Sequence, residues 1–287
     1  MILSAEFLQT LDKISMVVKR TRNRQLAGKK PSVHVGSGLE FHDYIPYQPG
    51  DDYRYVDWSL YARLGQLFLK TFTEEHDTNI HFLVDSSSSM NQPKAKLTMA
   101  AQLAGALGYI SLRQLDAVGA AFTTDTVVKS LAPKKGRSQI LHLLRFLDQD
   151  TAVGQTNLAQ VLGDFAWSHK RPGIVVVISD FFDDSDYFQA LRRLMGSGWQ
   201  VILVQVLSPD ELNPTWSQPI VVVDSETGQQ IPLDPNGLAA KYTERLQEFQ
   251  ARLASLVPLG IHYVPVSTEV SLEQVIFQAL RAQGVVQ

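Results

Sequence analysis

Short apolar runs alternate with longer helical patterns from about residue 78 to the C-terminus, and this alternation constrains the fold more than any other feature. The run 174–178 is apolar at every position and the run 201–207 at every position but Gln205, as expected of strands that helices cover on both faces. The pattern predicts strands over 79–84, 117–122, 126–131, 173–178, 201–207 and 261–266. It predicts helices over 94–114, 138–147, 158–169, 187–195, 237–256 and 272–281. The sequence therefore predicts an α/β fold with a doubly wound, mostly parallel sheet.

Residues 1–77 differ in character from the rest of the chain, and this places the expected domain boundary. They hold one predicted helix, a basic segment over 19–30 and a loop-rich part crowded with Tyr, Pro, Gly and Asp. We expect this N-terminal extension to pack on the sheet and to contribute a strand around 67–73. Three of its aromatic side chains are expected to be buried: Tyr53, Tyr55 and Trp58. Residues 78–287 are the expected α/β domain, with a hairpin inserted at about 218–234.

The composition excludes several classes of protein. The absence of cysteine excludes a disulfide scaffold, a Cys-ligated zinc site, an iron–sulfur cluster and a thiol nucleophile. A net charge of −3 argues against a dedicated nucleic-acid binder. No apolar run approaches the roughly 20 residues of a transmembrane helix, and no signal peptide is recognised, so we expect a cytoplasmic protein. The basic segment 19–30 is either a solvated surface or a contact for a membrane surface or an acidic partner.

Polar oxygen-bearing side chains follow the predicted strands where each strand ends. Asp85, Ser87 and Ser89 form a D-x-S-x-S pattern after the first strand, Thr156 lies in a Gly-containing loop, and Asp180 follows the strand at 173–178. Strand ends at the carboxyl edge of such sheets are where ligands bind. Oxygen ligands suit Mg²⁺, or another divalent cation such as Mn²⁺ or Ca²⁺. The alternative for the serines is an ordinary helix N-terminal loop.

These residues resemble the metal-ion-dependent adhesion site of von Willebrand factor A domains. The resemblance implies that Ser87, Ser89 and Thr156 bind the metal directly, and that Asp85 and Asp180 act through water. The chain departs from the family where Ser88 and Phe181 stand in place of Gly, so the loops around them are expected to differ. Three acidic residues that follow Phe181 are expected to begin the next helix rather than to extend the site: Asp183, Asp184 and Asp186.

The N-terminal extension carries a second resemblance, to the bacterial domain-of-unknown-function family 58. The segments that carry it are Gly38–Phe41, Tyr47–Arg54, Val56–Trp58, Ala62–Arg63, Phe68–Phe72 and Glu74–Glu75. In that family such a segment directly precedes an A-type domain. The resemblance implies a MoxR-type AAA+ ATPase as partner, in chaperone-like protein maturation or assembly.

We interpret the chain as a non-catalytic, metal-dependent protein-binding module. Neutral hydroxyl ligands would leave the cation electron-poor, so an open coordination position favours an acidic side chain of a partner. The chain has neither a G-x-S-x-G elbow nor a P-loop. The alternative is a Mg²⁺-dependent phosphatase of the haloacid dehalogenase type with Asp85 as nucleophile, although Ser87 stands where that chemistry needs a second Asp.

Overall fold

The computed structural model describes residues 2–17, 40–73, 78–91, 93–149, 154–214, 220–223, 230–233 and 238–287. Contacts divide the chain into two compact units, residues 1–18 with 78–287 and residues 19–77. The N-terminal helix thus belongs with the α/β unit, whereas the sequence placed it in the extension. The basic segment 19–30 lies outside the described residues. The expectation that the extension packs on the sheet stays a prediction.

The larger unit is built on a six-stranded sheet in the order β10-β7-β6-β3-β4-β5. The strands are β3 Asn79–Asp85, β4 Ala117–Thr123, β5 Val127–Lys134, β6 Ile174–Ser179, β7 Gln200–Leu207 and β10 His262–Ser267. All neighbours are parallel except β4 and β5, which pair antiparallel. When these six strands are numbered 1 to 6 in chain order, so that β3 is strand 1, the sheet order from the β5 edge is 3-2-1-4-5-6. This is the order of a doubly wound sheet. The predicted fold class is confirmed.

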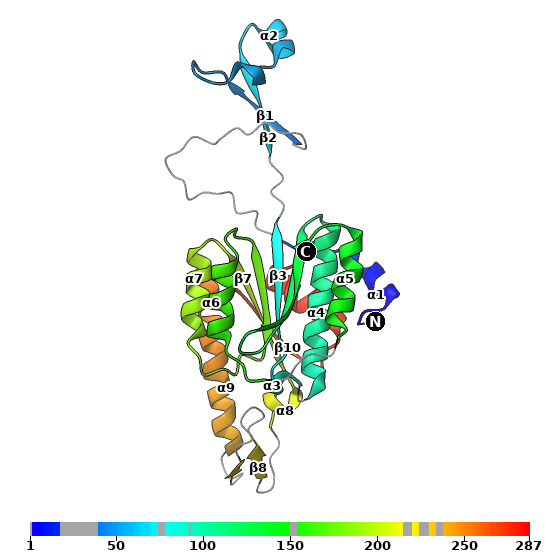
Figure 1. Cartoon of the computed structure of the whole chain (residues 1–287), viewed down its shortest axis with the longest axis vertical. Helices are drawn as coiled ribbons and strands as arrows, with labels where there is room; N and C mark the ends of the chain where they lie inside the picture. Colours follow the sequence, from blue (N-terminus) through cyan, green and yellow to red (C-terminus); the bar gives the residue numbers. More distant parts are fainter. Residues whose placement is uncertain are drawn as a thin grey trace. The chain divides into compact units, whose positions relative to one another are not determined.

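Helices cover both faces of this sheet, with α4 and α5 on one side and α6, α7 and α9 on the other (Figure 1). The helices of this unit are α1 Ala5–Leu11, α3 Ser88–Asn91, α4 Lys94–Arg113, α5 Arg137–Leu147, α6 Leu158–Ser168, α7 Tyr187–Gly196, α8 Pro209–Leu212, α9 Leu238–Ala254 and α10 Leu272–Gln274. A 3₁₀ turn at Val257–Leu259 follows α9, and a π-helical segment at Val275–Leu280 continues α10. None of the helices in the described ranges is both long and apolar enough to span a membrane.

Two hydrophobic cores lie on opposite faces of the sheet, because successive side chains of a strand point to opposite sides. In β3, Phe82 and Val84 belong to the core beneath α4 and α5, and Leu83 belongs to the core beneath α6 and α7. β6 alternates in the same way, and all of its residues are buried. This two-sided burial explains why the central strands read as continuous apolar runs.

The N-terminal helix α1 is anchored to α4. Its Phe7 and Leu11 are buried in the same core as α4. At its C-terminal end Asp12 accepts a hydrogen bond of 2.7 Å from the Tyr109 hydroxyl. The N-terminal residues therefore extend the helical layer on this face.

A small hairpin stands between β7 and α9. Its strands, β8 Ile220–Val223 and β9 Gln230–Leu233, pair antiparallel. They lie within the range 218–234 in which the sequence predicts an inserted hairpin. The turn residues 224–229 lie outside the described residues.

The smaller unit is a two-stranded antiparallel sheet of β1 Glu40–Pro46 and β2 Phe68–Thr73, with a 3₁₀ turn at Tyr53–Tyr55 and α2 Trp58–Leu64 between the strands. The predicted strand near residue 70 is present, and its partner is β1. Asp57 is buried and caps α2 by accepting hydrogen bonds from the Ser59 and Leu60 amides.

The expectation that the aromatic residues of this segment are buried was wrong for two of them. Tyr53 is 69% exposed and Trp58 is 60% exposed, while Tyr55 is half-buried. Among the side chains of this unit that the structure describes, the buried apolar ones are Val56 and Leu69.

Candidate metal centre

The predicted site lies where the strand order of the central sheet reverses. β3 and β6 are neighbours, yet the chain leaves β3 toward β4 on one side and leaves β6 toward β7 on the other. Asp85 is the last residue of β3, and Asp180 directly follows β6. Helices depart in opposite directions at such a switch point, which leaves a crevice beyond the carboxyl ends of the strands. The topology therefore places two of the predicted residues at the usual ligand position of this fold class.

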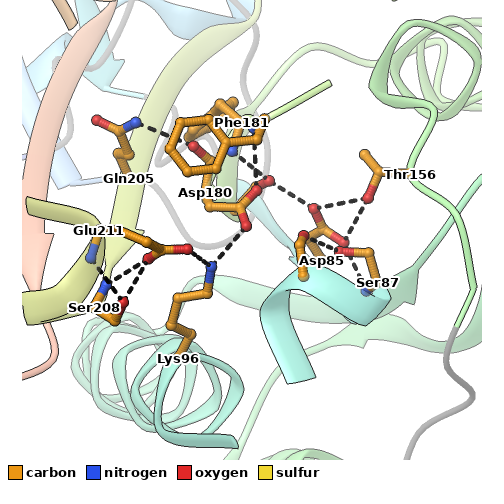
Figure 2. A network of polar contacts seen from close by, with 12 residues as sticks. Asp85, Ser87, Lys96, Thr156, Asp180, Phe181, Gln205, Ser208 and Glu211 are labelled. Carbon is orange, nitrogen blue, oxygen red and sulfur yellow. Dashed lines mark hydrogen bonds and ion pairs between the residues drawn. The ribbon is translucent and has the colours of Figure 1, made fainter. Parts of the chain in front are cut away.

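Asp85 is the centre of the cluster (Figure 2). Its side chain is buried and accepts hydrogen bonds from the Ser87 amide at 2.9 Å and from the Ser179 hydroxyl at 2.6 Å. The Thr156 hydroxyl lies 3.3 Å from both carboxylate oxygens. Thr156 comes from the loop before α6, so the structure brings together residues 71 positions apart in the sequence.

The two predicted serine ligands face each other. The Oγ atoms of Ser87 and Ser89 are 3.1 Å apart. In an octahedral Mg²⁺ site with ligands at about 2.1 Å, adjacent oxygens are separated by about 3 Å. Ser87 is buried, whereas Ser89 and Thr156 are partly exposed. The hydroxyls of Ser87 and Ser89 are therefore spaced as neighbouring ligands, and water has partial access to Ser89 and Thr156.

Asp180 occupies a different environment from Asp85. Its Oδ2 accepts a hydrogen bond of 2.8 Å from the Lys96 ammonium, and its Oδ1 accepts one from the Phe182 amide at 3.1 Å. Lys96 is completely buried and also donates to Glu211 at 2.6 Å. Asp180 thus lies beside the hydroxyl cluster while sharing its charge with an ammonium group.

Lys96 and Glu211 were missed in the sequence, although each leaves a signal. Lys96 lies three, four and seven residues before the buried Met99, Ala100 and Leu103, which places it on the apolar stripe of α4. Glu211 is the fourth residue of a capping box that begins at Ser208, directly after β7. Neither signal identifies the ion pair by itself, because the two residues are 115 positions apart in the sequence.

The electrostatics of the cluster favour a cation. Burial and the charge of Asp180 raise the pKa of Asp85, against the opposing effect of its hydrogen bonds with Ser179 and Ser87. Burial alone would lower the pKa of Lys96, but Asp180 and Glu211 outweigh it and the pKa is raised. The carboxylates of Asp85, Asp180 and Glu211 and the ammonium of Lys96 together carry a formal charge of −2. One divalent ion would neutralise this charge.

The candidate ligands fit a hard divalent ion only when the hydroxyl groups are counted among them. In the part of the chain that the structure describes, no three His, Asp or Glu side chains gather as a ligand set. The cluster offers the hydroxyls of Ser87, Ser89 and Thr156 and the carboxylate of Asp85. All are oxygen atoms, as Mg²⁺ prefers.

The loop after β6 holds its shape through buried hydrogen bonds. Phe181 is completely buried with a φ of 62°, where the A-domain family has Gly. A left-handed backbone costs an L-residue about 1–2 kcal/mol. The Ser179 hydroxyl accepts from the Phe181 amide, and Gln205 donates to the Asp180 carbonyl at 3.1 Å. The ring and these bonds hold the backbone angle that Gly would adopt freely.

The prediction for Asp183 was right about a helix N-terminus but wrong about which helix. Its carboxylate accepts a hydrogen bond of 2.6 Å from the Leu158 amide at the start of α6, not α7. The Ser185 hydroxyl accepts from the next amide, that of Ala159, at 3.1 Å. Thr156 lies two residues before Leu158, so Asp183 fixes the loop that carries it.

Comparisons with known proteins place the chain among its relatives. A family model described as "Protein of unknown function DUF58" matches residues 43–251. Uncharacterized proteins of Mycobacterium bovis and of Mycobacterium tuberculosis are 25% identical over 239 residues, which cover 80% of this chain and 74% of theirs.

The chain is also similar to solved structures, of which three are described. BatB from Bacteroides thetaiotaomicron matches with a TM-score of 0.44 at 19% identity, over 72% of this chain and 98% of that one. An aerotolerance-related membrane protein from Bacteroides fragilis matches with a TM-score of 0.45 at 19% identity, over 71% and 99%. A von Willebrand factor type A protein from Catenulispora acidiphila matches with a TM-score of 0.35 at 16% identity, over 49% and 35%.

Proposed function

The chain belongs to the DUF58 family of proteins of unknown function, and on that premise we propose that it is a non-catalytic protein-binding module whose binding depends on a divalent cation. Mg²⁺ is the first candidate, and Mn²⁺ and Ca²⁺ share its preference for oxygen ligands. Ser87, Ser89 and Thr156 would hold the ion directly, with Asp85 and Asp180 acting through water.

The observation that carries this proposal is the convergence of hydroxyl groups on a buried carboxylate at the switch point of the sheet. Hydroxyl ligands are neutral, so they leave most of the ion's charge uncompensated. The exposed side of Ser89 and Thr156 gives an outside ligand access to that charge. A carboxylate of a partner protein has the matching charge and ligand type.

For the partner we propose a MoxR-type AAA+ ATPase, with the chain as its adaptor or co-chaperone in protein maturation or assembly in the cytoplasm. The resemblance of residues 38–75 to the family signature supports this choice. It is a family analogy, because the fold itself hosts many functions.

The test is an affinity pull-down with the full chain as bait, in Mg²⁺ buffer, from a lysate of the source organism. The bound AAA+ ATPase is quantified by mass spectrometry. Chelation of Mg²⁺ is an ambiguous control, because the ATPase itself needs Mg²⁺ for nucleotide chemistry. The decisive comparison therefore keeps Mg²⁺ constant and changes the bait.

The double variant Ser89→Ala/Thr156→Val removes two proposed ligands at partly exposed positions. Thr98→Val is the matched control, because this threonine is exposed on α4 and donates its hydroxyl to the Lys94 carbonyl. We expect the ATPase with the wild type and the control but not with the double variant. Equal recovery with all three baits would contradict the metal-dependent docking.

A further inference from the structure

Lys96 is the one ammonium group of the described residues that is completely buried. It comes from the apolar stripe of α4 and donates to Asp180 at 2.8 Å and to Glu211 at 2.6 Å. Removing an ammonium ion from water is unfavourable unless it is paired with anions, so these two carboxylates are required to keep it buried. The chain thus carries a fixed positive charge beside the proposed cation site (Figure 2).

A bound ion and Lys96 would share one carboxylate. Asp180 is one of the two acidic residues that the proposed site uses through water, and it already accepts a hydrogen bond from Lys96. Two positive charges near the same carboxylate repel each other, and the repulsion is strong where water is excluded. Lys96 must therefore weaken the attraction between this site and any cation.

We propose that Lys96 is a tethered cation that sets the affinity of the candidate site for divalent ions, with Glu211 offsetting part of its charge. The inference rests on the proposed function, because it concerns the same cation site. Lys96 is a positioning and charge-setting residue, since its ammonium contacts Asp180 and Glu211 rather than the hydroxyl ligands. The ligand class is a divalent cation such as Mg²⁺ or Mn²⁺.

Glu211 is the more accessible of the two acidic partners of Lys96. Its side chain is 23% exposed, whereas those of Lys96 and Asp180 are 0% and 1% exposed. Its second oxygen accepts from the Ser208 amide at 2.7 Å, which fixes it at the start of α8. The partly exposed carboxylate can lose its charge by substitution at a smaller cost to folding than either buried partner.

The experiment measures Mn²⁺ affinity of the full chain by electron paramagnetic resonance at pH 8, where carboxylates are ionised. Lys96→Met removes the buried charge, and Lys94→Met removes a charge from an exposed position on the same helix. We expect Lys96→Met to bind Mn²⁺ about tenfold more tightly and Lys94→Met to change the affinity by less than about twofold. Lys96→Arg keeps the charge and is expected to stay close to the wild type.

Glu211→Gln is the second variant, and it tests the proposal if Lys96→Met fails to fold. Losing this negative charge should weaken Mn²⁺ binding by about threefold or more. Folding of Lys96→Met only in the presence of Mn²⁺ would also support the proposal, because the ion then replaces the missing ammonium. Weaker or unchanged binding by Lys96→Met, or tighter binding by Glu211→Gln, would overturn it.

The wild-type result separates this inference from the proposed function. If the wild type binds no Mn²⁺ but Lys96→Met does, the tethered cation is supported and the metal dependence of the natural chain is rejected. If the wild type and Lys96→Met bind equally, the site stands and the role of Lys96 is rejected. If no variant binds Mn²⁺, both proposals are wrong.

Discussion

Replacing Asp183 with alanine is expected to destabilise the protein and to loosen the candidate metal centre at the same time. The Asp183 carboxylate accepts a hydrogen bond of 2.6 Å from the Leu158 amide and another of 2.9 Å from the Ser185 amide. Leu158 is 1% exposed, so water has little access to its amide once the carboxylate is removed. The substitution therefore leaves a buried donor without its partner at the N-terminus of α6.

The magnitude follows from these contacts. Loss of an N-terminal capping interaction costs about 1–2 kcal/mol, and a hydrogen bond to a charged group is worth about 1.5–3 kcal/mol. Because the two figures describe overlapping effects, we expect Asp183→Ala to lower the free energy of unfolding by about 2–3 kcal/mol. Asp183→Asn keeps an acceptor and should cost about 1 kcal/mol.

The assay is urea unfolding followed by circular dichroism, with Asp184→Ala as the control. Asp184 is the next residue, is exposed, and loses the same charge on substitution. We expect the control to stay within about 0.5 kcal/mol of the wild type. Thr156 lies on the loop that Asp183 holds, so Mn²⁺ affinity should also fall in Asp183→Ala. Equal stability of the Asp183→Ala and Asp184→Ala variants would refute this reasoning.

Three further predictions concern the α/β unit. Burial, followed by the charge of a neighbouring histidine, lowers the pKa of His81 from 6.5 to about 4. Between these pH values the unfolded chain binds a proton that the folded chain does not. Lowering the pH from about 6.5 to about 4 should therefore lower the free energy of unfolding, by at most about 3 kcal/mol. His81→Leu should remove this part of the pH dependence in urea titrations. A Cβ at Gly173 would overlap the Asn79 carbonyl oxygen, whereas one at Gly163 in α6 meets nothing within 4 Å. Gly173→Ala should therefore lower the unfolding temperature, while Gly163→Ala should preserve or raise it, and the opposite order would contradict the strand packing. Purified protein should not hydrolyse a generic phosphate ester with Mg²⁺; turnover abolished by Asp85→Asn would favour the phosphatase alternative.

The sheet could be predicted from the sequence because strands that are buried on both faces are recognisable as short apolar runs. The central strands are short, mostly apolar runs, of which 174–178 is apolar throughout, and the main helices are longer than the strands. The ends of the predicted elements fall within a few residues of the observed ones. The order of the strands, which brings the ends of β3 and β6 together, was not predicted, because the crossover rules restrict the possible topologies without selecting one. The expectation that Asp85, Ser87, Ser89 and Thr156 cluster came from the strand-end positions of the D-x-S-x-S pattern and from the resemblance to the adhesion site.

The partners of the predicted residues were harder to identify, because they depend on side-chain contacts between distant elements. Lys96 meets Glu211 across 115 positions of sequence, and Asp183 meets the start of α6 across 25. Neither spacing belongs to a local motif. A lysine on an apolar helix face is normally interpreted as a side chain whose charge reaches water, and burial with two acidic partners emerges only in three dimensions.

The prediction that the aromatic residues of the smaller unit are buried was wrong for a related reason. Aromatic residues are usually buried, so Tyr53 and Trp58 were expected in a core. A small two-stranded sheet has too little apolar surface to cover them. Trp58 instead contacts Tyr61 edge-to-face at 6.1 Å on the exposed helix α2.

The central claim is that Asp85, Ser87, Ser89 and Thr156 form a divalent cation site. Its most direct test is anomalous diffraction from a crystal of the full chain soaked in Mn²⁺. We expect one ion at the carboxyl ends of β3 and β6, with the hydroxyl oxygens of Ser87 and Ser89 at about 2.1 Å from it. An anomalous map without a peak at these hydroxyls, at a Mn²⁺ concentration that saturates binding in solution, would contradict it.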